Sequence, residues 1–284
     1  MLQRTSLQGS KPFLKWAGGK TQLLGPLSAL IPSFFNNYFE PFLGGGAMFF
    51  YLANQNFIKN GVTLSDINSD LVNVYKCLRV NPDLLLSKLI AHQKRYMQDR
   101  VTYYYKLRRT AYDDDFERAA QFITLNKTCY NGLYRVNKKG IFNVPIGKYK
   151  KPLIYDVTNL RLVSSILNLT NARIECIGYE QILQEASLDD FIYLDPPFSP
   201  ISETSNFTEY TMGGFREEDQ VNLAKVFKSL TKRKCKVVLS NSDSSLVREL
   251  YKDFEIGTVS SLRCINCKSA RRTGNKELII FNKT

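Results

Sequence analysis

The feature that most constrains the fold is a recurrence of short apolar segments, each closing on a glycine, an acid or a polar turn. Seven such strand candidates occupy residues 37–46, 61–68, 172–180, 191–198, 235–243, 254–261 and 276–282. Helical stretches, including 47–57 and 216–232, separate most of them. This alternation predicts an α/β fold with a doubly wound, mainly parallel sheet of seven strands, whose last two strands form an antiparallel hairpin.

One long interval interrupts the alternation. Between Asn68 and Ala172 the chain has no convincing parallel strand, and the stretch is helical and polar before it becomes rich in Tyr, Lys, Arg and Asn. A crossover between parallel strands needs only about a dozen residues. We therefore expect a catalytic domain made of residues 1–68 and 155–284, with an inserted, mainly helical domain at 69–154.

Positive charge is concentrated in the same interval. The chain has 39 Lys and Arg against 26 Asp and Glu, a net charge of +13. Residues 88–151 alone carry 15 Lys and Arg against 5 Asp and Glu, a net charge of +10. A solvated basic surface would explain a moderate excess, but such a concentration favours an insert that binds nucleic acid.

The hydrophobic pattern and the cysteines indicate where the protein is located and whether it binds a metal. No apolar run approaches the ~18 residues that span a bilayer, and the first residues lack the apolar stretch of a signal peptide. Six scattered cysteines favour reduced thiols, so we expect a cytoplasmic protein. Cys264 and Cys267 could begin a zinc site, but two further ligands at suitable spacing are missing, so no metal is expected.

The segment FIYLDPPF, residues 191–198, places a carboxylate at the end of a buried strand. Pro196 and Pro197 cannot donate ladder hydrogen bonds, so the strand must end at Asp195. Phe198 then presents an aromatic ring where the chain should turn into a helix. Because ligands bind at the carboxyl ends of strands in open α/β sheets, the segment predicts part of a site. The structural alternative is an Asp195 that caps a helix and a Phe198 in the core.

A glycine-rich turn and a second acid indicate a nucleoside cofactor. FLGGGAM, residues 42–48, opens a helix, and its glycines allow a ligand to approach the backbone. The dinucleotide pattern G-x-G-x-x-G would require glycine where Phe49 stands, which disfavours NAD or FAD. Asp66 follows Gly44 by 22 residues and ends the second strand, where an acid binds ribose hydroxyls. A site that can bind a ribose but lacks a phosphate-binding motif suggests S-adenosylmethionine as the cofactor.

An upstream segment, KPFLKWAGGKTQLL at 11–24, could complete the cofactor site. Trp16 and Lys20 could cover the methionine portion of S-adenosylmethionine, the lysine pairing with its carboxylate. Ordinary core packing is the alternative for Trp16.

Four motifs in order, LKWAGGK, PFLGGGA, LSDIN and DPPF, resemble those of the enzymes that methylate the amino group of adenine in DNA. More closely, residues 126–152 (NKTCYNGLYRVNKKGIFNVPIGKYKKP) and 206–210 (NFTEY) resemble the Dam-type and DpnII-type methyltransferases that act on GATC. The similarity covers roughly residues 11–282. It implies the S-adenosylmethionine-dependent methyltransferase fold and a helical domain that recognises double-stranded DNA.

The resemblance also implies roles for individual residues. The catalytic residues would be Asp195, Pro196, Pro197 and Phe198. The cofactor would contact Trp16, Ala17, Gly18, Lys20, Phe42, Gly44, Gly46, Asp66 and Asp195. DNA would contact Lys15, Tyr130, Asn131, Leu133, Arg135 and Tyr149. Lys127 departs from the family, in which arginine is more usual, and its role is left open.

The chemistry of adenine explains these residue types. The lone pair of the amino nitrogen is delocalised into the ring, and two acceptors, the Asp195 carboxylate and the Pro196 carbonyl, would make it available. Phe198 would stack on the base, which must be flipped out of the duplex to be reached. Arg135 would make a bidentate contact to guanine, whereas Lys138, Lys139, Lys150 and Lys151 would contact phosphates. Residues 202–215 would close over the flipped base.

Other readings remain in view. They are methylation of cytosine N4 or of RNA adenine, a nucleotide-dependent oxidoreductase, and a DNA-binding protein without catalysis. A restriction-modification system is the expected context, with replication control or a virus as alternatives. One asymmetric reader of DNA is compatible with a monomer.

Overall fold

The computed structural model describes residues 9–16, 18–137, 139–197, 215–261 and 275–283. Its strands are β1 (Tyr38–Glu40), β2 (Val62–Ser65), β3 (Arg173–Glu175), β4 (Phe191–Leu194), β5 (Lys236–Ser242), β6 (Glu255–Ser261) and β7 (Asn275–Phe281). Its α-helices are α1 (Leu24–Ser28), α2 (Ala47–Asn54), α3 (Ser69–Val80), α4 (Pro82–Gln98), α5 (Arg100–Arg109), α6 (Asp115–Thr128), α7 (Val157–Leu169), α8 (Tyr179–Ile182), α9 (Glu217–Lys232) and α10 (Ser245–Leu250). Two short 3₁₀ helices are η1 (Lys20–Gln22) and η2 (Tyr130–Gly132).

The seven strands form one sheet in the order β3-β2-β1-β4-β5-β7-β6. The first five are parallel, β7 runs antiparallel to β5, and β6 runs antiparallel to β7. Every strand overlaps one of the ranges expected from the sequence, and the doubly wound α/β fold with a closing antiparallel pair is confirmed. The chain order changes direction between β1 and β4, which places the topological switch point at their carboxyl ends.

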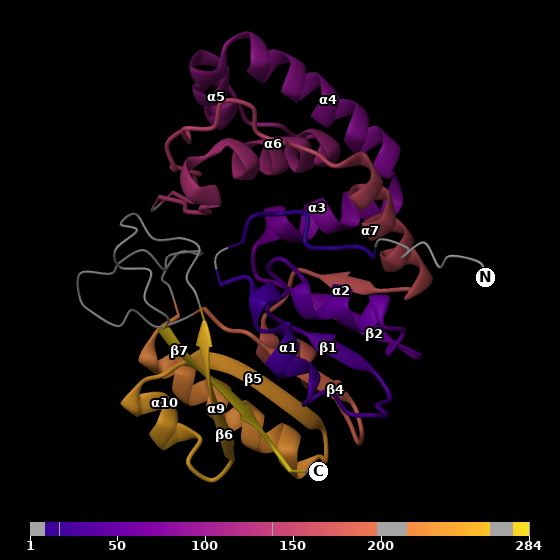
Figure 1. Ribbon diagram of the computed structural model, residues 1–284, viewed down its shortest axis with the longest axis vertical. Helices are drawn as coiled ribbons and strands as arrows, with labels where there is room; N and C mark the ends of the chain where they lie inside the picture. The colour runs from indigo at the N-terminus through magenta and orange to yellow at the C-terminus, as the bar shows by residue number, and fades with distance from the viewer. Residues whose placement is uncertain (1–8, 17, 138, 198–214, 262–274, 284) are drawn as a thin grey trace, which may run out of the picture.

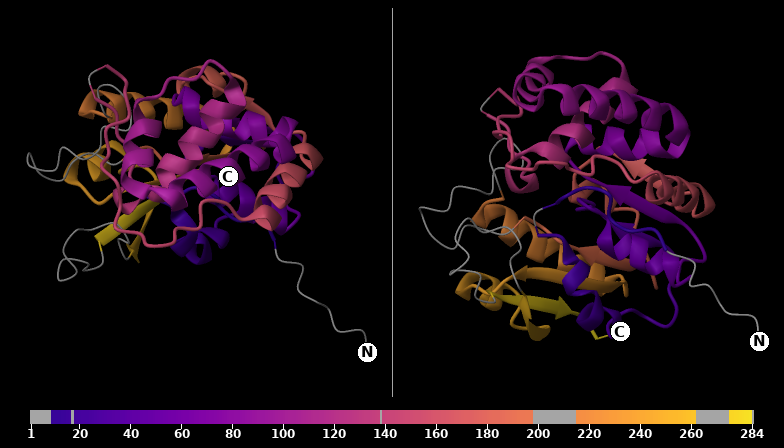
Figure 2. Two further views of the ribbon diagram at one scale, coloured as in Figure 1. Left: turned by 90° about the horizontal axis from the view of Figure 1, so that it is seen from above. Right: turned by 45° about the horizontal axis from the view of Figure 1, so that its top comes forward.

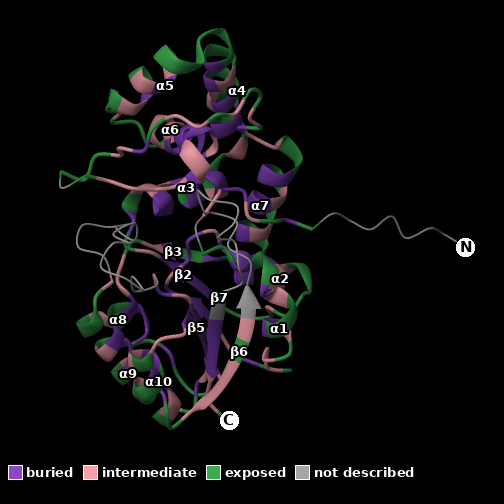
Figure 3. Cartoon of the chain, turned by 60° about the vertical axis from the view of Figure 1, so that its left-hand side comes forward, coloured by how far each residue is buried: buried purple, intermediate pink, exposed green. Residues whose placement is uncertain are grey.

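Alternating side chains of the strands supply two hydrophobic cores. In β4, Phe191 and Tyr193 join a core that contains α1, α2, α3 and α7. Ile192 and Leu194 point the other way and join a core with α8, α9 and α10. Figure 3 shows α8, α9 and α10 on one side of the sheet and α1 and α2 on the other. Because both faces are covered, β4 is buried along its whole length.

Helices α4, α5 and α6 lie beyond α3 and α7, on the far side from the sheet (Figures 1 and 2). They do not have a separate core, because Leu89, Tyr104 and Ile123 belong to the same buried cluster as the sheet residues Tyr38 and Phe191. Helix α3 contacts β3, α4, α6 and α7 and so links the sheet to the helical part of the chain.

These helices begin where the sequence supplies capping side chains. The caps that accept a hydrogen bond from a backbone N–H in the first turn are Asn68 of α3, Asn81 of α4, Asp99 of α5, Asp114 of α6 and Asp156 of α7. Each cap satisfies an otherwise unpaired N–H and typically contributes ~1 kcal/mol to helix stability. Pro82 follows the cap of α4 at the first helical position, where its missing N–H carries no cost.

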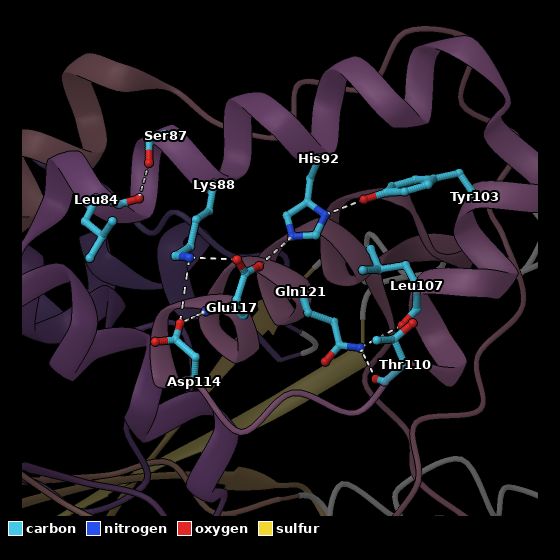
Figure 4. A network of polar contacts seen from close by, with 10 residues as sticks. All are labelled: Leu84, Ser87, Lys88, His92, Tyr103, Leu107, Thr110, Asp114, Glu117 and Gln121. Carbon is cyan, nitrogen blue, oxygen red and sulfur yellow. Dashed lines mark hydrogen bonds and ion pairs between the residues drawn. The ribbon is translucent and has the colours of Figure 1, made fainter.

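A polar network ties α4 to α5 and α6 (Figure 4). Lys88 Nζ lies 2.7 Å from Glu117 Oε1, and His92 Nδ1 lies 2.6 Å from the Tyr103 hydroxyl oxygen. Burial lowers the pKa of His92 to about 4, so this histidine is neutral near pH 7. It therefore joins α4 to α5 as a neutral group. In the part of the chain that the structure describes, none of the helices combines the length and the apolar character of a transmembrane span.

Candidate active site

Asp195 follows the last residue of β4 and pairs with a lysine from the amino-terminal segment. Lys20 Nζ lies 2.7 Å from Asp195 Oδ1 and donates a second hydrogen bond of 2.9 Å to the Gly18 carbonyl oxygen. The Lys20 side chain is only 4% exposed, whereas that of Asp195 is 20% exposed. The structure thus brings together two predicted site residues separated by 175 positions in the sequence. Within the described residues, Asp195 Oδ2 has no hydrogen bond and remains available to a substrate.

The electrostatics at Asp195 reflect competing effects. Burial raises the pKa of Asp195 to about 6, and the charge of Lys20 and its hydrogen bond oppose that rise. Glu277, whose Oε2 lies 3.8 Å from Lys20 Nζ, raises the pKa further. Asp195 is therefore mainly ionised at pH 7 and can accept hydrogen bonds. Pro196 is buried directly after it, and Pro197 is half-buried.

Glu40, the last residue of β1, is a second buried carboxyl group at this edge. Its Oε2 accepts hydrogen bonds from the Tyr38 hydroxyl at 2.7 Å and from the Phe49 N–H at 3.0 Å. Burial raises the pKa of Glu40 to about 8, and the nearby charge of Asp195 adds to the rise. A neutral Glu40 near pH 7 joins β1 to α2 beneath the glycine-rich turn.

The glycine-rich turn and the acid after β2 are joined directly. Asp66 Oδ2 accepts a hydrogen bond of 3.1 Å from the Gly44 N–H, and Asp66 Oδ1 accepts one of 3.0 Å from the Asn68 N–H. Burial raises the pKa of Asp66, and these backbone donors oppose the rise. The carboxylate remains partly exposed and retains lone pairs for further donors.

Gly44 and Gly46 both have backbone angles that favour glycine, with φ of +46° and +67°. A Cβ atom at Gly44 would lie 2.7 Å from the indole of Trp16, so no larger residue fits beside that ring. Gly46 precedes α2 and caps it in the left-handed conformation. Phe42, at the start of the turn, instead contacts Tyr179, with 5.3 Å between the ring centroids.

Trp16 lies between the glycine-rich turn and the helical part of the chain. Its ring stacks on Tyr134 and Phe122, with centroid distances of 5.9 and 6.4 Å. The packing alternative for Trp16 is therefore observed, and the ring also borders the glycine-rich turn. Sequence reasoning did not single out Tyr134, although it stands inside the YNGLYR motif.

Lys15 joins the amino-terminal segment to the predicted DNA-reading segment. The side chain of Asn126 accepts a hydrogen bond of 2.8 Å from the Lys15 N–H and donates one of 2.7 Å to the Lys15 carbonyl oxygen. Lys15 Nζ lies 3.8 Å from the centroid of the Tyr149 ring and 3.3 Å from the Lys127 carbonyl oxygen. The structure therefore places Lys15 and Tyr149 in contact with each other.

The other predicted DNA contacts follow one another along an irregular backbone. Asn131 has a φ of +54° within η2, and the Tyr130 N–H donates a hydrogen bond of 2.9 Å to the Pro145 carbonyl oxygen. Leu133 is half-buried beside them. Arg135 Nε donates a hydrogen bond of 2.7 Å to Asn143 Oδ1, which orients the guanidinium and leaves its terminal nitrogens without a partner among the described residues.

Lys127 is half-buried near these residues. Burial lowers its pKa to about 8, and the positive charges of Lys15 and Lys11 contribute to the lowering. Three lysines so close together repel one another in the free protein. An anionic ligand would relieve that repulsion.

Several expectations lie outside the described residues. They concern Ala17, Lys138, Phe198, the pair Cys264 and Cys267, most of the loop 202–215, and the NFTEY segment. Among the residues that the structure does describe, no cluster of three or more His, Cys, Asp or Glu could hold a metal ion.

Sequence reasoning missed the two carboxyl groups Glu40 and Glu277. Each is an acid inside a strand that is otherwise apolar, in FEPF and in KELIIF. Burying a carboxylate is costly unless it is neutral or paired, so an acid in a buried strand is itself a signal of a site. That signal was present in both strands.

The strand order, the glycine-rich turn and the acids after β2 and β4 define a class, the S-adenosylmethionine-dependent methyltransferase fold. Within that class, the model of the D12 class N6 adenine-specific DNA methyltransferase family matches residues 16–265. The chain belongs to this family of adenine-specific DNA methyltransferases.

Curated relatives match over nearly the whole chain. The Type II methyltransferase M.MjaIII of Methanocaldococcus jannaschii is 44% identical over 96% of this chain and 99% of its own length. The Type II methyltransferase M1.LlaDCHI of Lactococcus lactis subsp. cremoris is 42% identical over 99% of this chain and 98% of its own length. The DNA adenine methylase of Escherichia coli strain K12 is 33% identical over 98% and 97%. None of these names states a target sequence.

Proposed function

We propose that this enzyme transfers a methyl group from S-adenosylmethionine to N6 of adenine within GATC in duplex DNA, and that it flips the adenine out of the helix to do so. The observation that carries the proposal is the Asp195 carboxylate at the end of β4. One of its oxygens is held by Lys20 and the other has no hydrogen bond among the described residues. Asp195 stands at the switch point of the sheet, where such folds bind ligands.

Asp195 and Pro196 would act on the amino group of adenine. Asp195 Oδ2 and the Pro196 carbonyl oxygen accept its two N–H hydrogens, which draws the nitrogen toward tetrahedral geometry and makes its lone pair available. The nitrogen gains positive charge during transfer, and the ionised Asp195 stabilises that charge before the proton leaves. The Lys20 pair and the prolines hold the acceptors in place beforehand, so little reorganisation is needed during reaction. Phe198 would supply the ring against which the base stacks.

S-adenosylmethionine, when bound, supplies the methyl group. The residues present fit this molecule, because Asp66 is partly exposed at the end of β2 and retains lone pairs for ribose hydroxyls. The neighbouring Ile67 is 59% exposed and offers an apolar surface to a purine ring. Gly44, Trp16 and Lys20 would enclose the remaining portion. Gly18, Phe42 and Gly46 would shape the same wall.

DNA would be read by residues 126–152 together with Lys15. Arg135 is the best candidate for guanine recognition, because Asn143 fixes its Nε and leaves the terminal nitrogens for a bidentate contact. Tyr130, Asn131 and Leu133 would enter or line the opened duplex. We propose residues 69–154 as the recognition part of the chain and residues 1–68 and 155–284 as the catalytic part, the two sharing one hydrophobic core.

The proposed biological context is a restriction-modification system. Two relatives with 44% and 42% identity are named Type II methyltransferases, which supports this context over replication control. Their coverage of the chain is nearly complete, so the likeness extends to the recognition segment as well as the sheet.

Labelled methyl transfer to matched duplexes tests the proposal. We expect incorporation into unmethylated GATC duplexes, release of N6-methyladenine on digestion, and loss of the reaction when either flanking G–C pair is changed. A duplex already methylated on both strands is the control. Equal labelling of all sequences would exclude GATC specificity, and label in cytosine would exclude adenine as the substrate.

A further inference from the structure

We propose that Glu277 of β7 is a positioning residue for methyl transfer, because its carboxylate shares Lys20 with Asp195 and strengthens Asp195 as a hydrogen-bond acceptor. The proposal rests on the catalytic role proposed for Asp195. It adds a third charged group to the pair formed by Lys20 and Asp195.

The antiparallel direction of β7 brings Glu277 to the site. The parallel strands end at the edge where β7 begins, so Glu277 lies opposite Ser242, the last residue of β5. Its side chain is 10% exposed, and its Oε2 lies 3.8 Å from Lys20 Nζ. Lys20 Nζ lies 2.7 Å from Asp195 Oδ1, so one buried ammonium serves two carboxylates. A carboxylate in such a place is costly unless a cation compensates it.

The reason for a second carboxylate is the charge that the reaction creates. The lone pair of adenine N6 forms the N–C bond while the C–S bond of the methyl donor breaks and leaves its electron pair on sulfur. The nitrogen carries positive charge until one N–H proton passes along the hydrogen bond to the Asp195 carboxylate and from there to water. Glu277 brings a second carboxyl group beside Lys20, and its charge raises the pKa of Asp195. Asp195 is therefore a stronger hydrogen-bond acceptor than it would be beside Lys20 alone.

The other ionisable groups that face Asp195 do not supply this charge. Glu40 interacts with Asp195, but burial raises the pKa of Glu40 to about 8, so it is mainly neutral at pH 7. Tyr193 is buried with a raised pKa and donates to or accepts from Ser240 across 2.9 Å. Among the described groups that raise the pKa of Asp195, Glu277 is thus the carboxyl group that shares Lys20 with it.

Glu277→Gln tests the proposal, with Glu255→Gln as the matched control. Glu255 is a strand glutamate of β6 that pairs with Lys283 at 2.7 Å, far from the site and partly exposed. The measurements are the single-turnover rate at saturating cofactor and DNA, both dissociation constants, and the pH profile of the rate. We expect Glu277→Gln to slow transfer about tenfold with both dissociation constants nearly unchanged. Its acid limb should move to lower pH, because the charge of Glu277 raises the pKa of Asp195.

A merely structural role for Glu277 would not move the acid limb. If Glu277→Gln matches Glu255→Gln in rate and acid limb, the proposal is overturned. If Glu277→Gln unfolds at a much lower temperature than the wild-type enzyme, Glu277→Asp is tested in its place. That variant keeps the charge but moves it away from Lys20, so we expect roughly threefold slower transfer with a small shift of the acid limb to lower pH. A wild-type rate for Glu277→Asp in that case would overturn the proposal.

A titration of the free protein separates this inference from the proposed function. Carboxyl-carbon NMR of labelled aspartate follows Asp195, whose signal is assigned by its loss in Asp195→Asn. We expect Glu277→Gln to lower the pKa of Asp195 and Glu255→Gln to leave it unchanged. If the pKa falls but the wild-type enzyme does not methylate adenine, the proposed function fails and the charge coupling stands. If adenine is methylated and the pKa does not move, the role of Glu277 fails alone.

Discussion

The end of β4 and the segment 126–152 hold their charged groups in different ways. At the end of β4, charged groups are buried and compensated by residues from other elements, as Asp195 is by Lys20. In the segment 126–152, cations lie on irregular backbone that side-chain amides support, as Asn143 supports Arg135. The first arrangement fixes a carboxylate at the end of a sheet strand, and the second presents cations for which we propose a role in DNA binding. The comparison predicts that substitutions in one region alter methyl transfer and substitutions in the other alter DNA recognition.

The largest expected effect comes from removing the acceptor at β4. Asp195→Ala should slow methyl transfer at least ~100-fold, because the amino group loses its charged acceptor. DNA affinity should change little, since the recognition segment is untouched. Rapid-quench transfer assays and titration of labelled DNA measure the two quantities. Asp253→Asn, at an exposed aspartate that pairs with Lys228, is the control. A rate within a few-fold of wild type would remove Asp195 from the mechanism.

A substitution of Arg135 tests the comparison from the recognition segment instead of from the β4 region. Arg135→Ala should cost about 1–3 kcal/mol of discrimination at the guanine it contacts, with a smaller loss on a duplex that already lacks that guanine. The measurement is kcat/KM on GATC and on singly altered duplexes. An equal loss on matched and mismatched duplexes would mean that Arg135 contacts only the backbone.

Asp66, the acid proposed to bind the cofactor, provides a second test of whether the two regions act separately. Asp66→Ala should weaken S-adenosylmethionine binding by about tenfold, because the ribose hydroxyls lose a charged acceptor. Non-specific DNA affinity should remain near wild type. Calorimetric titration with each ligand checks both expectations. Parallel losses for cofactor and DNA would contradict the idea of two separable regions.

The acid limb of the transfer rate is expected to depend on the β4 region. Asp195 must be ionised to accept the amino hydrogens, and burial raises its pKa to about 6. The transfer rate should therefore be nearly constant above this pKa and fall about tenfold for each pH unit well below it. DNA binding measured over the same range shows whether the limb belongs to chemistry. A limb that persists in Asp195→Asn would assign it to another group.

The smallest effect is expected from the exposed lysines at the end of the recognition segment. Lys150→Ala or Lys151→Ala should weaken binding to all duplexes alike and reduce the salt slope by about 1, as loss of one phosphate contact does. Both side chains are exposed. Binding curves at several salt concentrations provide the measurement. Altered discrimination between duplexes would instead indicate a base contact.

The sheet could be predicted from sequence because its signals are local. Each strand is a mainly apolar run that ends near a glycine, an acid or a polar turn, and Pro196 alone fixes the end of β4. The short helices α8 and α10 were not anticipated, since four to six residues carry little periodicity.

The contacts within the site could be predicted only in part. The motifs indicated that Lys20 and Asp195 belong to one site, but not that they form an ion pair, because their pairing depends on tertiary packing. The contact between Glu277 and Lys20 was harder still to predict, because the position of Glu277 depends on the antiparallel direction of β7. Tyr134 was missed because an aromatic residue inside a recognition motif looks the same whether it meets DNA or Trp16.

The reciprocal hydrogen bonds between Lys15 and Asn126 span 111 residues of chain. Closing so long a loop carries a large entropic cost that local helix formation does not share. We therefore expect α4, α5 and α6 to form early during folding and the segment after Asn126 to reach its final shape only when residues 15 and 16 dock. During synthesis, the amino-terminal segment must wait for that partner to leave the ribosome. The part of the enzyme that reads DNA would then be the last to mature.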